Sequence, residues 1–297
     1  MIHIRATRDR LLAALRILRV ACHIGYGLLL ATFYPLLSQQ GQRRILKHWS
    51  RALLDILHVG LDTYGCQLPA STHGVLLVAN HVSWLDVIAM TAAVPSYFVA
   101  KSELGDWPLL GWMTGRVNAL FLQRDMRRDT ARINSQLAAL LKHGENVGIF
   151  PEGTTSDGKS IRHFHSSLLQ GAIDIAAPVC PLVIRYHDGT GGANDDAAFV
   201  GEMNFIQSLW NILRSPSLHV TIAYLPMLPS AGQNRRVLAA QAQADIQTAL
   251  AQLTRGEFSL PRDGSPKRAW RDALLPLTPA YSLLLSPLPG RGEKPPR

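Results

Sequence analysis

Cysteine is scarce in this sequence. Only 3 of the 297 residues are cysteine, and Cys22, Cys66 and Cys180 lie far apart without a CxxC pair. Structural zinc sites and disulfide frameworks need clustered thiols, so the sequence predicts neither and fits a reducing compartment. Histidine supplies no metal site either, because His163 and His165 alternate without a third nearby ligand. No Gly-x-Ser-x-Gly follows a predicted strand, which argues against a serine hydrolase.

Acidic residues are also in short supply. Lysine and arginine number 30 against 21 aspartates and glutamates, which gives a net charge of +9 and a pI of about 9.8. Such a balance indicates an anionic partner, either nucleic acid or an acidic membrane surface. Residues 1–59 hold nine basic side chains and two acidic ones, arranged around the uncharged stretch Val20–Leu37. Aromatic residues make up only 7% of the chain, so we expect a membrane surface and no nucleic acid.

The N-terminal region is predicted to be helical and membrane-associated. Val20–Leu37 is 18 residues long, near the lower limit of about 17–25 residues for a membrane-spanning helix. It could span the bilayer, enter one leaflet or lie in the interface, and a pair of core helices in a soluble protein is the alternative. Residues 40–65 have the apolar spacing of a second amphipathic helix. We therefore predict a membrane-anchoring helical segment over residues 1–65.

From residue 66 onward, short apolar runs alternate with helical patterns. This alternation predicts an α/β domain over residues 66–257, with a mixed, largely parallel sheet flanked by helices. The expected strands are 75–79, 96–100, 119–122, 146–150, 179–186 and 218–225, and the expected helices lie near 86–94, 107–116, 129–143, 166–176 and 234–253. Residues 258–297 are rich in proline and arginine, which predicts a flexible basic tail.

Two predicted strands end in polar segments suited to catalysis. Asn80 and His81 follow the run 74–79, and Asp86 comes five positions after the histidine. On a regular helix residues five apart do not share a face, so the two side chains meet only if the backbone turns between them. Ser83 suits the N-cap of the following helix, and Asp86 its first turn. The carboxylate would then orient the imidazole as a general base.

The second polar segment follows the strand predicted at 146–150. Its sequence is Phe-Pro-Glu-Gly-Thr at residues 150–154, where Pro151 stiffens the turn and Gly153 permits a close backbone approach. Polar loops after neighbouring strands of an α/β sheet are the usual place for a site. Each segment alone has an ordinary explanation, a core histidine in the first and a plain turn in the second.

Together these residues resemble the glycerolipid acyltransferase family that includes 1-acyl-glycerol-3-phosphate acyltransferases. The family has four sequence blocks, and counterparts of all four occur here in order. They are Asn80, His81 and Asp86 for the Asn-His-x4-Asp block; Phe121 and Arg124 for the second; residues 150–154 for the third; and residues 177–181 for the fourth. Lys101, in Lys-Ser-Glu-Leu, resembles the segment that precedes the second block.

The resemblance implies a glycerol-3-phosphate acyltransferase-like fold and a direct acyl transfer. His81 would be the general base and Asp86 its orienting partner, with acyl-CoA or acyl carrier protein as co-substrate and no cofactor or metal. Lys101 and Arg124 would hold the phosphate of a lysophospholipid acceptor, and Phe121, Glu152, Gly153 and Thr154 would complete the substrate site. Backbone donors in the loop after His81 are candidates for stabilising the oxyanion. The expected location is a membrane on its cytoplasmic face, the inner membrane in a bacterium.

Some features leave alternatives open. Asn118 stands where the family usually has glycine, and His165 where many members have lysine or arginine. The segments Ser83–Asp86 and Lys101–Glu103, with Trp107-Pro108, also resemble enzymes that acylate lyso-ornithine lipid. The main interpretation is therefore acylation of 1-acyl-glycerol-3-phosphate to phosphatidic acid. Lyso-ornithine lipid is the alternative acceptor, and a non-catalytic membrane scaffold is the second alternative.

Overall fold

The computed structural model describes residues 2–65, 74–101, 119–122 and 127–258. The helix predicted at 107–116, the tail from 259 onward, and Arg124 lie outside these ranges. The strands are β1 Val59–Gly65, β2 Leu76–Ala79, β3 Tyr97–Lys101, β4 Ala119–Leu122, β5 Val147–Ile149, β6 Val179–His187 and β7 Leu218–Tyr224. The α-helices are α1 Ile2–Phe33, α2 Gln39–Leu57, α3 Leu85–Ala93, α5 Arg127–Lys142, α6 Gln170–Asp174, α7 Phe205–Arg214 and α8 Arg235–Arg255, with 3₁₀ turns η1 Tyr34–Leu36 and η3 Ser166–Leu169.

The strands form one seven-stranded sheet in the order β1-β7-β6-β2-β5-β3-β4. Every neighbouring pair is parallel except β6 and β7, which run antiparallel. The predicted mixed, largely parallel sheet is confirmed. The two strands that end in the polar segments, β2 and β5, are direct neighbours with Val78 opposite Ile149. Their carboxyl ends therefore meet at one edge of the sheet.

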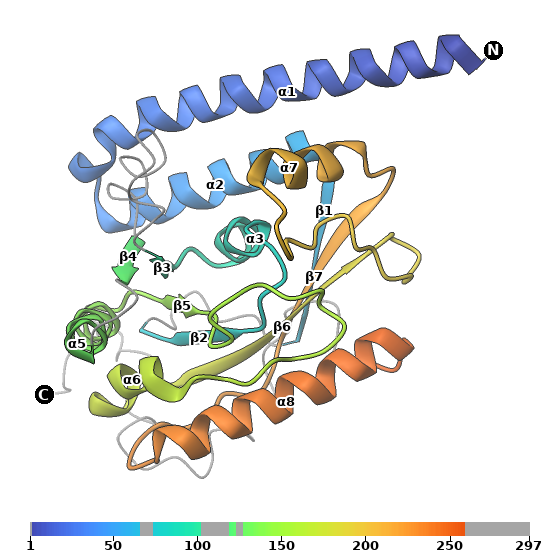
Figure 1. Ribbon diagram of the computed structural model, residues 1–297. Coiled ribbons are helices and arrows are strands. Elements are labelled where there is room, and N and C mark those ends of the chain that lie inside the picture. Colours follow the sequence, from blue (N-terminus) through green and yellow to red (C-terminus); the bar gives the residue numbers. More distant parts are fainter. Residues whose placement is uncertain (1, 66–73, 102–118, 123–126, 259–297) are drawn as a thin grey trace, which may run out of the picture.

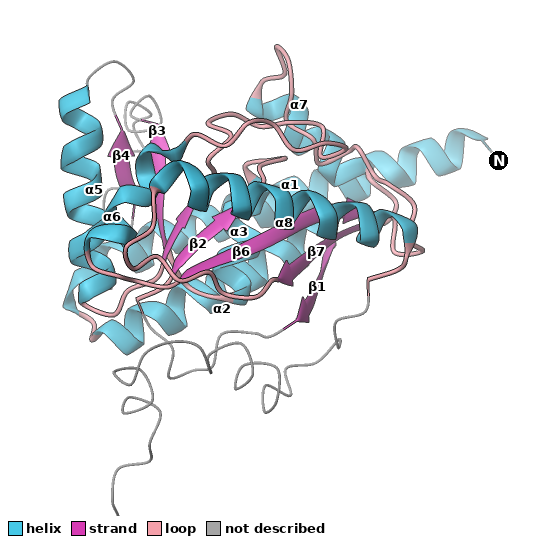
Figure 2. Ribbon diagram, turned by 90° about the horizontal axis from the view of Figure 1, so that it is seen from below, coloured by secondary structure: helices cyan, strands magenta, loops and turns pink. Residues whose placement is uncertain are grey.

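Helices cover both faces of the sheet, and each face has its own apolar core (Figures 1 and 2). Alternate residues of β6 show the division, because Ile184 packs with α2, α3 and α7 while Val183 packs with α5, α6 and α8. Each fully buried Leu, Ile or Val contributes about 1.5–3 kcal/mol of transfer free energy. Figure 2 shows α8 crossing the sheet on the face opposite α3.

Helix α1 runs alongside α2, and its N-terminal end extends beyond α2 (Figures 1 and 2). Its buried residues recur at helical spacing at Val20, His23, Gly27 and Ala31. The His23 ring stacks on Trp49 of α2 with centroids 4.8 Å apart, and the indole Nε1 donates to the His23 carbonyl at 3.3 Å. A side chain at Gly27 would collide with this indole, since its Cβ would lie 2.7 Å from Nε1. Close packing at Gly27 thus fixes α1 against α2.

One part of the helix prediction is wrong. The second amphipathic helix ends at Leu57 rather than residue 65, because His58 takes a left-handed conformation with φ of 59° and closes α2. Residues 59–65 form β1, which pairs in parallel with β7. The stretch is rich in β-favouring Val, Thr and Tyr and holds two glycines, which favours a strand over a helix. The sheet therefore begins inside the segment predicted as a helical anchor.

Helix α7 is absent from the predicted elements, although the sequence carries a signal for it. Asn204 and Gln207 form a capping box, in which the Asn204 side chain accepts from the Gln207 N–H and the Gln207 side chain accepts from the Asn204 N–H. This reciprocal pair satisfies two donors that a helix start otherwise leaves unpaired. The helix packs its Ile212 and Leu213 into the core shared with α2 and α3.

Candidate active site

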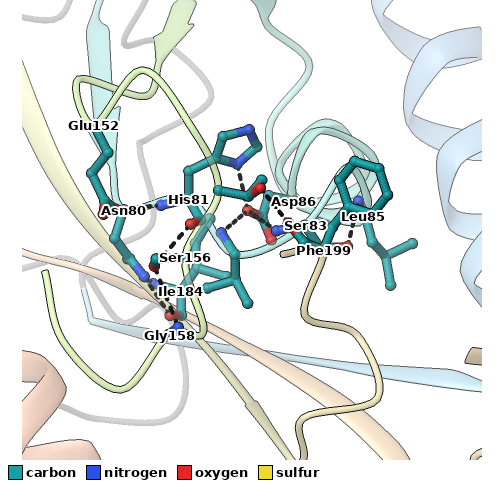
Figure 3. A network of polar contacts seen from close by, with 12 residues as sticks. Asn80, His81, Ser83, Leu85, Asp86, Glu152, Ser156, Gly158, Ile184 and Phe199 are labelled. Atoms are coloured by element: carbon teal, nitrogen blue, oxygen red, sulfur yellow. Dashed lines mark hydrogen bonds and ion pairs between the residues drawn. The ribbon is translucent and has the colours of Figure 1, made fainter. Parts of the chain in front are cut away.

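His81 and Asp86 meet at the carboxyl edge of the sheet, as the sequence predicts. The chain turns after β2, α3 begins at Leu85, and Asp86 lies in its first turn. His81 Nδ1 is 2.8 Å from Asp86 Oδ2, which also accepts hydrogen bonds from the backbone N–H groups of Val82 at 2.7 Å and Ser83 at 2.9 Å. Figure 3 shows the carboxylate at the centre of these contacts. The turn between the two residues is thus closed by the aspartate itself.

The Asp86 carboxylate has a further partner on a distant strand. The Tyr186 hydroxyl on β6 donates to Asp86 Oδ1 at 2.7 Å. Both side chains are fully buried, and burial beside Asp86 raises the pKa of Tyr186 well above its ordinary value. The phenol thereby provides a hydrogen-bond partner for the second oxygen of a carboxylate that is out of reach of water. Sequence reasoning missed Tyr186, because it lies within an apolar strand 100 residues away.

The His81 ring is positioned for proton transfer. Its side chain is 19% exposed, and one face stacks on Phe150 with centroids 4.0 Å apart and planes at 12°. Because Nδ1 faces a carboxylate, the neutral ring carries its proton there and leaves the Nε2 lone pair available, a tautomer inferred from the contact. In the described ranges no residue bonds to Nε2, and Figure 3 shows it on the side of the ring away from Asp86.

Glu152 joins the two strand-end loops. Its Oε1 accepts the His81 backbone N–H at 2.8 Å and its Oε2 accepts the Arg162 N–H at 3.0 Å. The carboxylate is buried, and this burial raises the pKa of Glu152 although both hydrogen bonds act in the opposite direction. Gly153 and Thr154 are both exposed at the surface, and Gly153 has a φ of 68°, a conformation that favours glycine.

Asn80 and Ser156 hold the backbone on either side of the histidine. The Asn80 side chain donates to the Ile184 carbonyl at 2.9 Å and accepts the Ile184 N–H at 2.8 Å. This pair extends the contact of β2 with β6 beyond the last ladder residue. From the other loop, Ser156 N–H and Oγ both reach the His81 carbonyl, at 2.8 and 3.2 Å. Glu152 at the N–H of His81 and Ser156 at its carbonyl therefore fix the His81 backbone, and the Asn80 side chain fixes the residue before it.

Two details of the predicted loop need correction. The helix N-cap is Trp84, not Ser83, although Ser83 Oγ accepts the Leu85 N–H at 3.3 Å. The N–H groups of Val82 and Ser83, which lie in the loop proposed to supply oxyanion donors, both donate to Asp86. Because each is used in orienting the carboxylate, these two groups do not face a substrate.

The predicted phosphate ligands lie partly outside the described residues. Arg124 falls outside them, and for Lys101 and Phe121 only the backbone is described, at the end of β3 and in β4. Both strands run parallel to β5 on its far side from β2. A basic residue that sequence reasoning missed is the exposed Arg162, whose charge acts on Glu152. Within the described ranges no group of three His, Cys, Asp or Glu side chains could hold a metal.

Comparisons with known proteins agree with this geometry. The sequence profile of the family described as Acyltransferase matches residues 62–185. A 1-acyl-sn-glycerol-3-phosphate acyltransferase from Neisseria meningitidis is 34% identical over 213 residues, covering 71% of this chain and 83% of that protein. A lyso-ornithine lipid O-acyltransferase from Pseudomonas aeruginosa is 37% identical over 210 residues, covering 70% and 79%.

A solved structure has the same fold. The crystal structure of the 1-acyl-sn-glycerophosphate (LPA) acyltransferase PlsC from Thermotoga maritima matches with a TM-score of 0.62 at 19% identity. The match covers 84% of this chain and 97% of that one. With the sequence relatives covered over most of their length and the His81–Asp86 pair in place at the sheet edge, this chain belongs to the acyltransferase family and is an acyltransferase.

Proposed function

We propose that this acyltransferase moves a fatty acyl group to the free hydroxyl of 1-acyl-glycerol-3-phosphate and so makes phosphatidic acid. The observation that carries the chemistry is the His81–Asp86 contact, with Nε2 of the same ring left available. The donor would be a thioester, acyl-CoA or acyl carrier protein, acting as co-substrate. No cofactor is needed for this transfer.

The proton follows a simple route. His81 Nε2 removes the proton of the acceptor hydroxyl while that oxygen attacks the thioester carbonyl carbon. The buried Asp86 carboxylate stabilises the imidazolium that forms. When the tetrahedral intermediate collapses, the carbon–sulfur bond breaks and the imidazolium returns its proton to the leaving thiolate. The products are the ester and the free thiol, and no acyl-enzyme is formed.

Basic side chains support an acceptor that carries a phosphate. Arg124 and Lys101 remain proposed phosphate ligands, and the exposed Arg162 is a third candidate because its backbone is tied to Glu152 next to His81. A guanidinium group can bind a phosphate with two parallel hydrogen bonds. We place Gly153, Thr154 and Phe121 near the acceptor or acyl chain, and Glu152 holds their loop against His81.

Lyso-ornithine lipid is the second candidate acceptor. The Pseudomonas aeruginosa relative of that name is 37% identical, slightly more than the 34% of the Neisseria meningitidis relative named for glycerol phosphate. The chemistry at His81 is the same for both acceptors, since each offers a free hydroxyl. The head groups of the two acceptors differ in charge, so the proposed phosphate ligands Lys101, Arg124 and Arg162 would bind them with different affinity.

A membrane location is supported by α1. Among the described residues there is one segment that is long and apolar enough to cross a membrane. It is Leu15–Leu36, with a mean hydropathy of 1.4. One row of this segment packs on α2 and most of its other residues are exposed, so we propose that α1 lies in the interface of an anionic bilayer rather than crossing it. The large apolar side chains that it exposes are Leu15, Ile17, Leu18, Tyr26, Leu29, Phe33 and Leu36. The cytoplasmic face would supply the thioester.

The test is acyl transfer by purified protein, wild type and His81→Ala, from labelled acyl-CoA and acyl carrier protein. Lysophosphatidic acid and lyso-ornithine lipid are offered in parallel. Product that depends on His81 is expected with lysophosphatidic acid, and product with lyso-ornithine lipid alone would transfer the assignment to the second candidate. Transfer to neither acceptor by folded, vesicle-bound protein would reject both and favour a non-catalytic scaffold.

A further inference from the structure

Helix α7 exposes large apolar side chains to solvent. Ile206 is 76% exposed and Trp210, one turn later on the same side, is 39% exposed, while Val200 in the preceding loop is 36% exposed. The next residue in this row, Arg214, places its guanidinium 5.9 Å from the centre of the Trp210 ring. The outer side of α7 therefore presents an isoleucine, a tryptophan and a cation in sequence. We call Ile206, Trp210 and Arg214 the outer row of α7.

Helix α7 lies against α1. The Arg16 guanidinium of α1 donates to the Leu213 carbonyl at the end of α7 at 2.6 Å, so the two helices are in direct contact. Figure 1 shows α7 beside α1 and α2, on the face of the sheet opposite α8. On α1, Leu15 and Leu18 near this contact are 54% and 59% exposed, and Arg19 beside them is exposed. Both helices therefore expose apolar and basic side chains.

The inner side of α7 holds the catalytic loop. Trp84, which directly precedes α3, donates its indole N–H to the buried Ser208 hydroxyl at 3.0 Å. Its ring also packs on Phe205 with centroids 5.0 Å apart. In the segment leading to α7, the Phe199 N–H donates to the Val82 carbonyl at 3.0 Å, and the Phe199 carbonyl accepts the Thr155 hydroxyl. Helix α7 and the segment that leads to it thus touch both strand-end loops of the active site.

We infer that α7 is a second lipid-contacting element, whose outer row lies in the interface of an anionic bilayer. This contact holds the two strand-end loops of the active site next to the lipid surface. Tryptophan and isoleucine insert among the acyl chains, and Arg214 and Arg19 meet anionic head groups. The inference rests on the proposed function insofar as the acceptor is a membrane lipid. It adds that α1 alone does not determine how the active site faces that membrane.

A bilayer suits this surface better than a protein partner. Large apolar residues are exposed both on α7, at Ile206 and Trp210, and along Leu15–Leu36, so they extend over two contacting elements rather than one closed patch. Basic residues accompany them, as expected for contact with anionic lipids. A second copy of the chain would bring the same basic residues into opposition across a two-fold axis.

The test uses a double substitution at the outer row, Ile206→Ser with Trp210→Ser, in the full chain. The matched control is Val237→Ser, because Val237 is 58% exposed on α8, across the sheet from α7. Activity is measured with a long-chain acceptor embedded in vesicles of phosphatidylcholine and phosphatidylglycerol, and with a short-chain acceptor that is monomeric in solution. The double variant should lose roughly tenfold of its vesicle activity, as expected when two apolar anchors leave an interface. Its activity on the soluble acceptor and both activities of the control should remain those of wild type.

The outcomes separate the two proposals. If wild type transfers acyl groups to neither acceptor, the proposed function fails. If wild type is active but the double variant loses both activities equally, or neither, the inference about α7 is overturned while the proposed function stands. A second readout is the quenching of tryptophan emission by bromine-labelled lipids, which Trp210→Phe should reduce. Unchanged quenching overturns the inference, as does a wild-type dimer that the double variant converts to monomer.

Discussion

Replacing Asp86 in two ways separates its charge from its hydrogen bonds. Asp86 accepts hydrogen bonds from three N–H groups at Oδ2 and from the Tyr186 hydroxyl at Oδ1. In Asp86→Asn, the amide oxygen can take the place of Oδ2, and the amide NH₂ can donate to the Tyr186 oxygen, since a phenol also accepts. The opposite orientation would set NH₂ against three donors. The asparagine should therefore keep the fold and the histidine tautomer and lose only the negative charge.

The expected magnitudes follow from this difference. A hydrogen bond to a charged group contributes about 1.5–3 kcal/mol and a neutral one about 0.5–1.5, so Asp86→Asn should lower kcat/KM by about tenfold to a hundredfold. Asp86→Ala leaves the Val82 and Ser83 N–H groups and the Tyr186 hydroxyl without their acceptor. Each such loss costs about 1–3 kcal/mol in a buried site, so the free energy of unfolding should fall by at least about 3 kcal/mol.

Formation of labelled product gives kcat/KM, and urea unfolding gives stability. We expect Asp86→Asn to be nearly as stable as wild type but much slower, and Asp86→Ala to be both unstable and inactive. An asparagine variant with wild-type activity would show that the carboxylate charge does not assist His81. An alanine variant with wild-type stability would show that the loop does not depend on its hydrogen bonds to Asp86.

Three further predictions concern residues around this pair. Tyr186→Phe removes the donor to Asp86 and should lower kcat about tenfold. The control Tyr224→Phe, at another buried tyrosine, should leave steady-state kinetics unchanged, and equal effects of the two substitutions would contradict the role of the Tyr186 hydroxyl. The raised pKa of Glu152 means that the folded protein binds this proton more tightly than the unfolded chain, so wild-type stability should decline as pH rises above the ordinary glutamate value of 4.5. Urea unfolding across pH should show a shallower decline in Glu152→Gln, and parallel curves would refute this. Arg162→Gln should raise KM for lysophosphatidic acid severalfold at low salt and leave KM for the thioester unchanged; an unchanged acceptor KM would exclude phosphate binding there.

Local sequence patterns predict most strands of the sheet, including the edge strand β4, but miss the other edge strand, β1. Strands such as β2 and β6 are short apolar runs bounded by turn signals, so they are visible without tertiary information. The sequence pattern predicts a helix over β1, because the helical spacing of α2 continues past Leu57 to Leu61. What makes 59–65 a strand is its pairing with β7, and a single sequence does not reveal which distant segment supplies such a partner.

The site residues likewise divide into those that local sequence predicts and those that depend on tertiary contacts. His81 and Asp86 could be paired from sequence because the loop that joins them is short and follows a strand. Tyr186 could not, since its hydroxyl meets Asp86 only after β6 packs beside β2. For Glu152 the sequence gives the residue type but not its partners, which are backbone N–H groups of His81 and Arg162 and carry no signature in the sequence.

Most polar side chains of the two motifs bond to the protein itself. Asn80 bonds to the Ile184 backbone, Asp86 to the turn after His81, and Glu152 to the backbone on both sides of the site. Burying two carboxylates is costly unless their hydrogen bonds are satisfied, and here both are. Their combined effect is to fix the imidazole before substrate arrives, so little reorganisation is needed during proton transfer. We propose that substrate recognition depends instead on exposed residues such as Thr154 and Arg162 and on the lipid contact of α7, so changes at α7 should affect the delivery of the acceptor rather than the chemistry at His81.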